Sequence, residues 1–172
     1  PGVDLRIVDD SGNVLPAGQV GHIEVKGSGM ADHYRDDEAA TDIAFRGEWF
    51  HPGDMGHLSS AGLLYVSGRA DDMMSLASIN IFPSEIEAAF ASYPGLIECA
   101  AFALKSSAFG DIPLLAIVGS DELDLAAMSR FGRDRLGLRA PRKLFRVSAL
   151  PRNRGGKVLK DELRALFDQQ IK

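Results

Sequence analysis

The stretch Tyr65–Glu87, YVSGRADDMMSLASINIFPSEIE, joins two kinds of sequence pattern. Before it, apolar and polar residues alternate between glycines, which predicts short strands. Near its end, Pro83 is followed by Ser84 and, three residues later, by Glu87, a pattern typical of a helix start with a capping box. The pattern changes within residues 67–72, and this change predicts a boundary between a β-rich part and a mixed part.

Upstream of this boundary the chain has the pattern of an antiparallel β structure. Leu5 and Ile7 alternate with polar residues, and Ile23 and Val25 do the same after a turn rich in glycine. The run LLYVSG, residues 63–68, has the composition of a further strand.

Downstream of the boundary, strands and helices alternate. The apolar runs ECAAFAL and LLAIVG predict buried strands, and KLFRV predicts a short one. Helical spacing of apolar residues predicts one helix after Pro83, a second over residues 122–136 that ends at Gly137, and a third around Leu163. The overall fold class we expect is therefore α+β, with a β-rich first part and a small α/β second part.

The composition is that of a globular chain. Hydrophobic residues make up 45% of the 172 residues and charged residues 25%, and we find neither a bilayer-spanning apolar run nor a signal-peptide pattern. Cys99 is the single cysteine, which excludes an internal disulfide and fits a reducing compartment; we expect it to fill a core. These features predict a cytoplasmic location. The first residues look like a strand and turn entered within a fold, so we expect a longer protein.

The charge is unevenly distributed. The net charge is −5, yet residues 139–172 hold ten of the 19 lysines and arginines and three of the 24 acidic residues. A positive segment on a negative body favours a small anionic ligand such as a phosphate compound. It disfavours nucleic acid, because the acidic body would repel the backbone.

A glycine pair and a lysine stand in LPRNRGGKVLK, residues 150–160. A P-loop of the Walker type requires glycine at the position of Pro151, so that motif is excluded. Two interpretations remain open. Lys157 either approaches a phosphate or carboxylate, or belongs to a solvated turn before the last helix.

Two histidines flank an aspartate in HPGDMGH, residues 51–57. His51, Asp54 and His57 are possible metal ligands, but their spacing across a Pro-Gly turn is unfavourable, and we expect no metal here. Asp54 instead accepts hydrogen bonds either from backbone amides or from sugar hydroxyls. By default Trp49 is expected in the core.

The charged run GRADD, residues 68–72, lies at the predicted boundary. Arg69 either belongs to a surface ion-pair cluster or contacts a nucleotide just before a swivel point.

Taken together and in this order, the motifs resemble the C-terminal part of the adenylate-forming superfamily, which includes acyl-CoA synthetases, adenylation domains of peptide synthetases and luciferases. The resemblance covers almost the whole chain and is closest to acyl-CoA synthetases. It rests on the opening stretch and on four others: GHIEVKGSGMADHYRDDEAAT (21–41), WFHPGDMG (49–56), FGDIPLLAIV (109–118) and LPRNRGGKVLK (150–160). It implies that residues 1–68 are the β-rich end of an N-terminal AMP-binding domain. Residues 69–172 would be the mobile C-terminal domain.

The resemblance also implies roles for individual residues. Asp54 would bind the ribose hydroxyls of ATP, and Arg69 would contact the ribose and phosphate side. Asp71 would be the hinge of the C-terminal domain. Lys157 would be the catalytic lysine that reaches the α-phosphate and the carboxylate. The loop with Ala77 and Ser78 would line a tunnel for the pantetheine of CoA.

The implied activity is that of an acid–thiol ligase. A carboxylic acid and ATP would give an acyl-adenylate and pyrophosphate, and CoA would then give the acyl-CoA and AMP. Mg²⁺ would be held by the phosphates and by the missing N-terminal domain, which is also the expected partner of this chain. We expect no nucleic acid and no membrane span. The chain alone is expected to be inactive.

Some residues depart from the family pattern. Pro52 stands where the family usually has threonine, and Ala77 and Ser78 stand where many CoA ligases have two glycines. Side chains there would narrow the tunnel. Two alternatives therefore stay open. One is an adenylating enzyme that passes its acyl group to a carrier protein, and the other is a non-catalytic binding module with the same fold.

Overall fold

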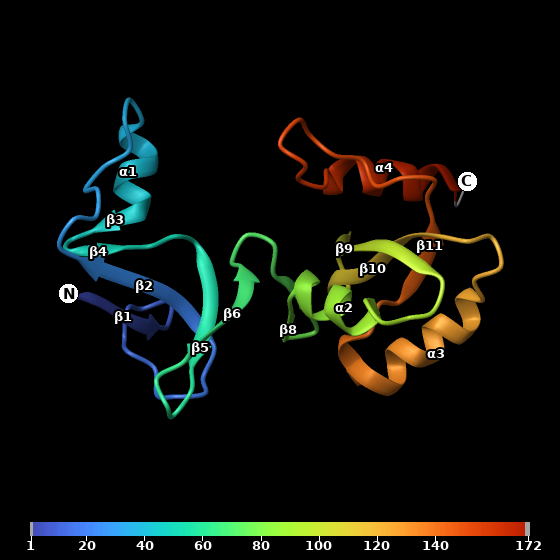
Figure 1. Cartoon of the computed structure of the whole chain (residues 1–172), viewed down its shortest axis with the longest axis horizontal. Helices are drawn as coiled ribbons and strands as arrows, with labels where there is room; N and C mark the ends of the chain where they lie inside the picture. The colour runs from blue at the N-terminus through green and yellow to red at the C-terminus, as the bar shows by residue number, and fades with distance from the viewer. Residues whose placement is uncertain (1, 171–172) are drawn as a thin grey trace. The chain divides into compact units, whose positions relative to one another are not determined.

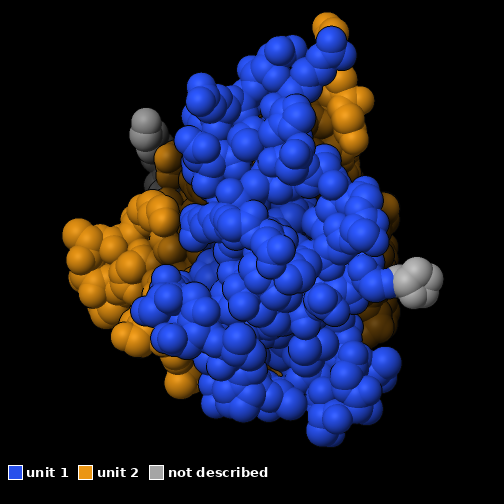
Figure 2. Space-filling view, turned by 90° about the vertical axis from the view of Figure 1, so that its left-hand side faces the viewer, with its two compact units in different colours: residues 1–71 blue, residues 72–172 orange. Residues whose placement is uncertain are grey.

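The computed structural model describes residues 2–170 (Figure 1), in two compact units that divide between Asp71 and Asp72 (Figure 2). The division lies three residues after the boundary expected at residue 68. Arg69 and Asp71 therefore belong to the first unit. No described helix has both the length and the apolar character that a membrane crossing requires.

The first unit is built on one antiparallel sheet. Its strand order is β3-β4-β2-β5-β6, and β1 pairs with β2 outside this path. The strands are β1 Val3–Val8, β2 Gly21–Gly27, β3 Phe45–Arg46, β4 Trp49–Phe50, β5 Asp54–Leu58 and β6 Leu64–Arg69. Ile7 and Ile23 are register partners in β1 and β2, and both are buried. The alternation seen in the sequence therefore directs one face of this pair inward.

One short helix in this unit was not predicted. Helix α1, Glu38–Ala44, begins after Asp37, whose carboxylate accepts a hydrogen bond from the Ala40 N–H at 2.9 Å. Such a bond satisfies a backbone donor that the first helical turn leaves free. The helix has seven residues and only Ala44 is buried, so its sequence has no apolar period to reveal it.

The second unit has a mixed sheet of five strands with the order β11-β10-β7-β8, in which β9 pairs with β10. Strands β10 and β11 are parallel, whereas the other pairs are antiparallel. The elements are β7 Met74–Leu76, β8 Ile79–Ile81, α2 Pro83–Phe90, β9 Leu96–Ser106, β10 Gly110–Gly119, α3 Leu125–Leu136, a 3₁₀ turn Gly137–Arg139, β11 Lys143–Arg146 and α4 Lys160–Gln170.

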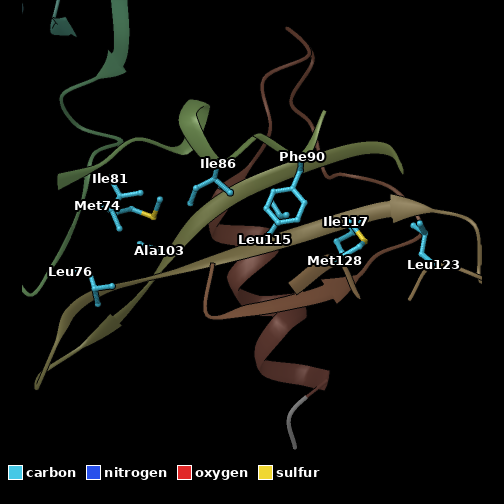
Figure 3. Packing of buried hydrophobic residues seen from close by; sticks show 11 residues of the cluster. Met74, Leu76, Ile81, Ile86, Phe90, Ala103, Leu115, Ile117, Leu123 and Met128 are labelled. Atoms are coloured by element: carbon cyan, nitrogen blue, oxygen red, sulfur yellow. The ribbon is translucent and has the colours of Figure 1, made fainter. Parts of the chain in front are cut away.

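Both faces of this sheet are covered, which explains the unbroken apolar runs in the sequence. Figure 3 shows Phe90 of α2 and Met128 of α3 near Leu115 and Ile117 of β10, on one face. On the other face, residues of alternate parity pack with α4 in a second cluster, whose members are Ala100, Phe102, Leu114, Ala116, Phe145, Leu150, Leu163 and Phe167. The second unit is thus a three-layer α/β/α arrangement, as expected for a small α/β domain.

The predicted capping box is wrong. The N-cap of α2 is Phe82, no side chain caps the helix, and Pro83 occupies its first turn. Glu87 turns toward the sheet instead, where Oε1 accepts a hydrogen bond from the Ala101 N–H of β9 at 2.9 Å. The Glu87 carboxylate thus bonds to strand β9 and not to the backbone at the start of its own helix, because α2 packs directly on that strand.

The core prediction is also wrong for Trp49. Its side chain is only half-buried, and the Arg6 guanidinium lies 4.0 Å from the centre of its ring. Cys99 is half-buried and packs against the cluster beneath α2. Burial raises the pKa of its thiol to about 11, so the thiol remains protonated and a poor nucleophile.

Candidate active-site elements

Asp54 and Arg69 stand opposite each other at the ends of two paired strands. They are register partners in β5 and β6, and Nη1 of Arg69 lies 3.6 Å from Oδ1 of Asp54. Among the described residues, no side chain or backbone group donates a hydrogen bond to the Asp54 carboxylate. Its oxygens are therefore available to accept hydrogen bonds from a ligand hydroxyl pair.

The Arg69 guanidinium is held in place by several groups of its own unit. Nη1 donates a hydrogen bond to the Pro52 carbonyl oxygen at 2.5 Å, and Nε lies 3.3 Å from Oδ1 of Asp71. Gly53 has a φ of +80°, and a Cβ there would lie 2.9 Å from Nη2 of Arg69. The positive φ favours glycine at this position, and the guanidinium lies against the space that a Cβ would fill. Arg69 contacts both Asp54 and Asp71, the residue expected as the hinge.

The three residues that raised the possibility of a metal site have separate partners. Nε2 of His51 lies 3.3 Å from Oε1 of Glu24, and the ring of His57 stacks on Tyr65 with centroids 5.0 Å apart. Residues 2–170 include no group of three His, Cys, Asp or Glu side chains placed to hold a metal ion. Within this motif, the Asp54 carboxylate is therefore the group that can accept hydrogen bonds from a ligand.

Lys157 lies in the second unit, on the loop between β11 and α4. The loop turns back on itself through an isolated bridge between Arg152 and Val158, and Leu150 fixes its start in the core. Lys157 is exposed, and its ammonium has no partner among residues 2–170. An unpaired ammonium on a closed loop can bind an anion without first breaking an ion pair.

The sequence interpretation overlooked Asn153 in this loop. Its side-chain oxygen accepts hydrogen bonds from the backbone N–H groups of Gly155 and Lys157. An asparagine two residues before a glycine is a known signal for a turn of this kind, so the sequence contained the information.

Ala77 and Ser78 form the two-residue turn between β7 and β8. Both are exposed, and their φ angles are +47° and +68°. Two successive positive φ angles define the hairpin turn that favours Asn-Gly or Gly-Gly. The side chains that the sequence places here therefore occupy a backbone suited to glycine.

Asp111 holds this hairpin to the neighbouring strand. Its buried carboxylate accepts a hydrogen bond from the Ser75 N–H at 3.1 Å and lies 2.6 Å from the Lys105 ammonium. Burial acts to raise the pKa of this carboxyl group, but the hydrogen bonds from Lys105 and Ser75 outweigh it, and the net pKa is lowered. The charged form of Asp111 thus fixes the base of the turn.

The chain is similar in sequence to known CoA ligases. The chain is 34% identical to the 2-succinylbenzoate–CoA ligase of Bacillus mycoides over 166 residues, which cover 96% of this chain and 34% of that protein. It thus spans about a third of the length of the curated relatives it matches. No protein-family model matches the chain.

The chain is also similar in structure to solved CoA synthetases and to an amide bond synthetase. The o-succinylbenzoate CoA synthetase of Bacillus subtilis, in complex with its acyl-adenylate intermediate, superposes with a TM-score of 0.88 and 29% identity over 94% of this chain and 34% of its own. That synthetase has also been solved with ATP and a magnesium ion. The amide bond synthetase McbA of Marinactinospora thermotolerans superposes with a TM-score of 0.86 and 28% identity over 97% of this chain and 35% of its own.

Proposed function

Because the chain corresponds in sequence and fold to the C-terminal part of an adenylate-forming acyl-CoA ligase, we propose that its parent protein is an ATP-dependent carboxylate–CoA ligase. In the first half-reaction, a carboxylate oxygen attacks the α-phosphorus of ATP, and pyrophosphate leaves. In the second, the thiol of CoA attacks the acyl carbon, and AMP leaves. The first compact unit, which ends at Asp71, supplies the end of the N-terminal domain, and the second, from Asp72 on, supplies the mobile C-terminal domain.

The observation that carries this proposal is the exposed, unpaired ammonium of Lys157 on a loop closed by its own hydrogen bonds. Attack of one anion on another concentrates negative charge in the transition state. A lysine that meets the α-phosphate and the carboxylate stabilises that charge more than it stabilises the separate reactants. Lys157 is the catalytic residue in this proposal.

Asp54 and Arg69 bind the nucleotide in this proposal. The open carboxylate of Asp54 accepts hydrogen bonds from the two ribose hydroxyls. The guanidinium of Arg69, held by the Pro52 carbonyl and by Asp71, contacts the ribose and phosphate side. Asp71 is the hinge about which the C-terminal domain turns between the two half-reactions.

Mg²⁺ enters with ATP. The phosphates and residues outside this chain would hold the ion. The ion would neutralise phosphate charge, while the Lys157 ammonium stabilises the negative charge that develops where the carboxylate meets the α-phosphate. ATP and CoA as substrates, together with a single cysteine, support a cytoplasmic location.

A second candidate differs only in the acceptor of the acyl group. Two observations favour an acceptor other than CoA, such as a carrier-protein thiol or an amine. The turn at Ala77 and Ser78 carries side chains where many CoA ligases have glycine, and the chain is similar to an amide bond synthetase. The adenylation step is the same in both cases.

The test uses the full-length protein that contains this chain. It is incubated with ATP, Mg²⁺ and a panel of carboxylic acids that begins with 2-succinylbenzoate, with and without CoA, and both pyrophosphate exchange and AMP are measured. AMP that accumulates only with CoA is the expected result and identifies the acid. Exchange without CoA turnover supports the second candidate. If no acid gives exchange or AMP, both candidate functions are contradicted, and a non-catalytic module is favoured. In that case Pro52→Thr is the first substitution to test, because the family usually has threonine at this position.

A further inference from the structure

We propose that Asn153 is the positioning residue for Lys157 in the adenylation step, an inference that rests on the proposed function. Asn153 stands four residues before Lys157 and does not need to touch a substrate. It acts by fixing the backbone from which the lysine side chain extends.

The hydrogen bonds of Asn153 all close on the same short segment. Its Oδ1 accepts from the Gly155 N–H at 3.0 Å and from the Lys157 N–H at 2.9 Å. Its own N–H donates to the Lys157 carbonyl at 3.0 Å, and its carbonyl accepts from the Gly156 N–H at 2.9 Å. Lys157 is thus bonded to Asn153 through both its N–H and its carbonyl group.

Gly156 makes this arrangement possible. Gly156 has a φ of +82°, a conformation that residues with side chains rarely adopt. A Cβ on Gly155 would lie 3.4 Å from Oδ1 of Asn153, an ordinary van der Waals contact, so the glycine requirement falls on Gly156. The Asn153 side-chain oxygen and Gly156 therefore belong to one turn, and this turn gives the Lys157 backbone a single orientation.

Arg152 attaches the turn to the body of the unit. Its Nη1 donates to the Gly156 carbonyl at 2.8 Å, and its Nη2 lies 2.6 Å from Oε2 of Glu98 on β9. The turn is therefore anchored at its edge as well as closed inside. Within the described part of the loop, the Lys157 side chain beyond its Cβ is left free to move toward a ligand.

A fixed backbone matters because a lysine side chain is long and flexible. A loop that already fixes the Lys157 backbone lowers the conformational entropy that is lost on reaching the transition state. Small displacements of a catalytic group also lower the reaction rate by large factors. Removing the Asn153 acceptor should therefore lower the rate of adenylation rather than the affinity for ATP, which other residues bind.

The test compares three variants of the full-length protein. Asn153→Ala removes the acceptor, and Asn153→Thr restores a neutral acceptor that makes similar turns. Asp124→Ala is the matched control, because Asp124 also accepts two backbone N–H groups, those of Ala126 and Ala127, in the same compact unit. Adenylation is followed by pyrophosphate exchange, and the second half-reaction is followed with supplied acyl-adenylate and CoA.

We expect Asn153→Ala to lower kcat of adenylation by at least about tenfold, with a KM for ATP within about threefold of the unmodified value. The second half-reaction should stay within about twofold. Asn153→Thr should regain most of the rate, and Asp124→Ala should affect neither half-reaction by more than about twofold. In a Lys157→Ala background, Asn153→Ala should cost nothing further, because the two residues act as a unit.

Other outcomes overturn the inference and separate it from the proposed function. Equal losses in both half-reactions, or an equal loss in Asp124→Ala, would show that Asn153 has a structural role only. An unchanged rate in Asn153→Ala would show that the loop needs no fixing. If the unmodified protein adenylates no acid, the proposed function fails, and the positioning role fails with it.

Discussion

Nε of Arg6 lies 2.6 Å from Oε2 of Glu24, and the two residues are direct cross-strand partners in β1 and β2. The Glu24 side chain is 3% exposed. Its second oxygen faces His51, and the Arg6 guanidinium also covers the ring of Trp49. A carboxylate this deeply buried depends on its partner, because it has lost its hydration.

Arg6→Met should therefore destabilise the protein by about 3 kcal/mol, since a buried charge without its partner costs far more than the pair contributes. Urea unfolding measures the loss. The double change Arg6→Met with Glu24→Met should recover part of it, because it removes both charges. A double variant at least as unstable as the single one would contradict this account.

His51 makes the stability depend on pH. Burial lowers the pKa of His51, despite the opposing effect of the Glu24 carboxylate. In the unfolded chain the group takes up a proton near its usual pKa of about 6.5, and in the folded chain only at lower pH. Stability is therefore full above that value and falls as the pH decreases from about 6.5 toward the folded pKa.

Urea unfolding between pH 7.5 and 5.5 checks this prediction. His51→Gln has no proton to bind and should flatten the pH dependence in this range, at some cost in overall stability. An unchanged slope in the variant would assign the dependence to other groups.

The turn at Ala77 and Ser78 predicts a change that stabilises the protein. Both residues have positive φ angles, which cost a residue with a Cβ about 1 kcal/mol relative to glycine. Ser78→Gly should raise the free energy of unfolding by about this amount. If the turn lies on the path of the acceptor thiol, the same change should also speed the second half-reaction.

Ser129→Gly is the matched control for this prediction. Ser129 lies inside α3, where glycine costs about 0.5–1 kcal/mol. The same substitution should thus have opposite signs at the two positions in thermal or urea unfolding. Destabilisation by Ser78→Gly would show that the serine side chain makes compensating contacts.

The sequence predicted the second unit better than the first. Residues 100–103 and 114–117 are buried on both faces and lie within apolar runs, and Gly137 ends α3 as predicted. These signals are local. The position of Trp49 is not, because it depends on Arg6, which lies 43 residues earlier in the chain. The bond from Ala101 to Glu87 likewise replaces a local cap with a tertiary one.

The candidate site also combines features that local sequence indicates with features that depend on the tertiary structure. The roles of Asp54, Arg69 and Lys157 came from a resemblance in motifs, and they stay predictions. What the structure adds is register: Asp54 and Arg69 are opposite each other because β5 and β6 pair in this alignment. A pairing register depends on the whole sheet, so motif spacing alone does not give it.

An ion pair links the start of the second unit to its last helix. The Lys160 ammonium lies 2.8 Å from Oδ1 of Asp72, the first residue after the division between the units. Both side chains are partly exposed, so we expect a coupling energy below about 1 kcal/mol. A double-mutant cycle of Lys160→Gln and Asp72→Asn by urea unfolding measures it. The coupling should shrink in 1 M salt, and a coupling insensitive to salt would argue against a simple ion pair.

Lys157→Ala should separate the two half-reactions of the full-length protein. The ammonium is free of partners within the described residues, so its removal leaves no buried charge and should cost little stability. Pyrophosphate exchange should fall by a factor of about a hundred or more, because the lysine acts on charge that develops in the transition state. Formation of acyl-CoA from supplied acyl-adenylate should stay near the unmodified rate, since that step does not use the ammonium.

Lys143→Ala is the control for the loss of a positive charge in the same unit. Lys143 lies on β11 with its ammonium 5.4 Å from the centre of the Phe167 ring. This variant should leave the exchange rate within about twofold, which would show that location rather than net charge decides the effect. If Lys157→Ala slowed both half-reactions equally, a single conformation would serve both, and the assignment of Asp71 as a hinge between them would lose its support.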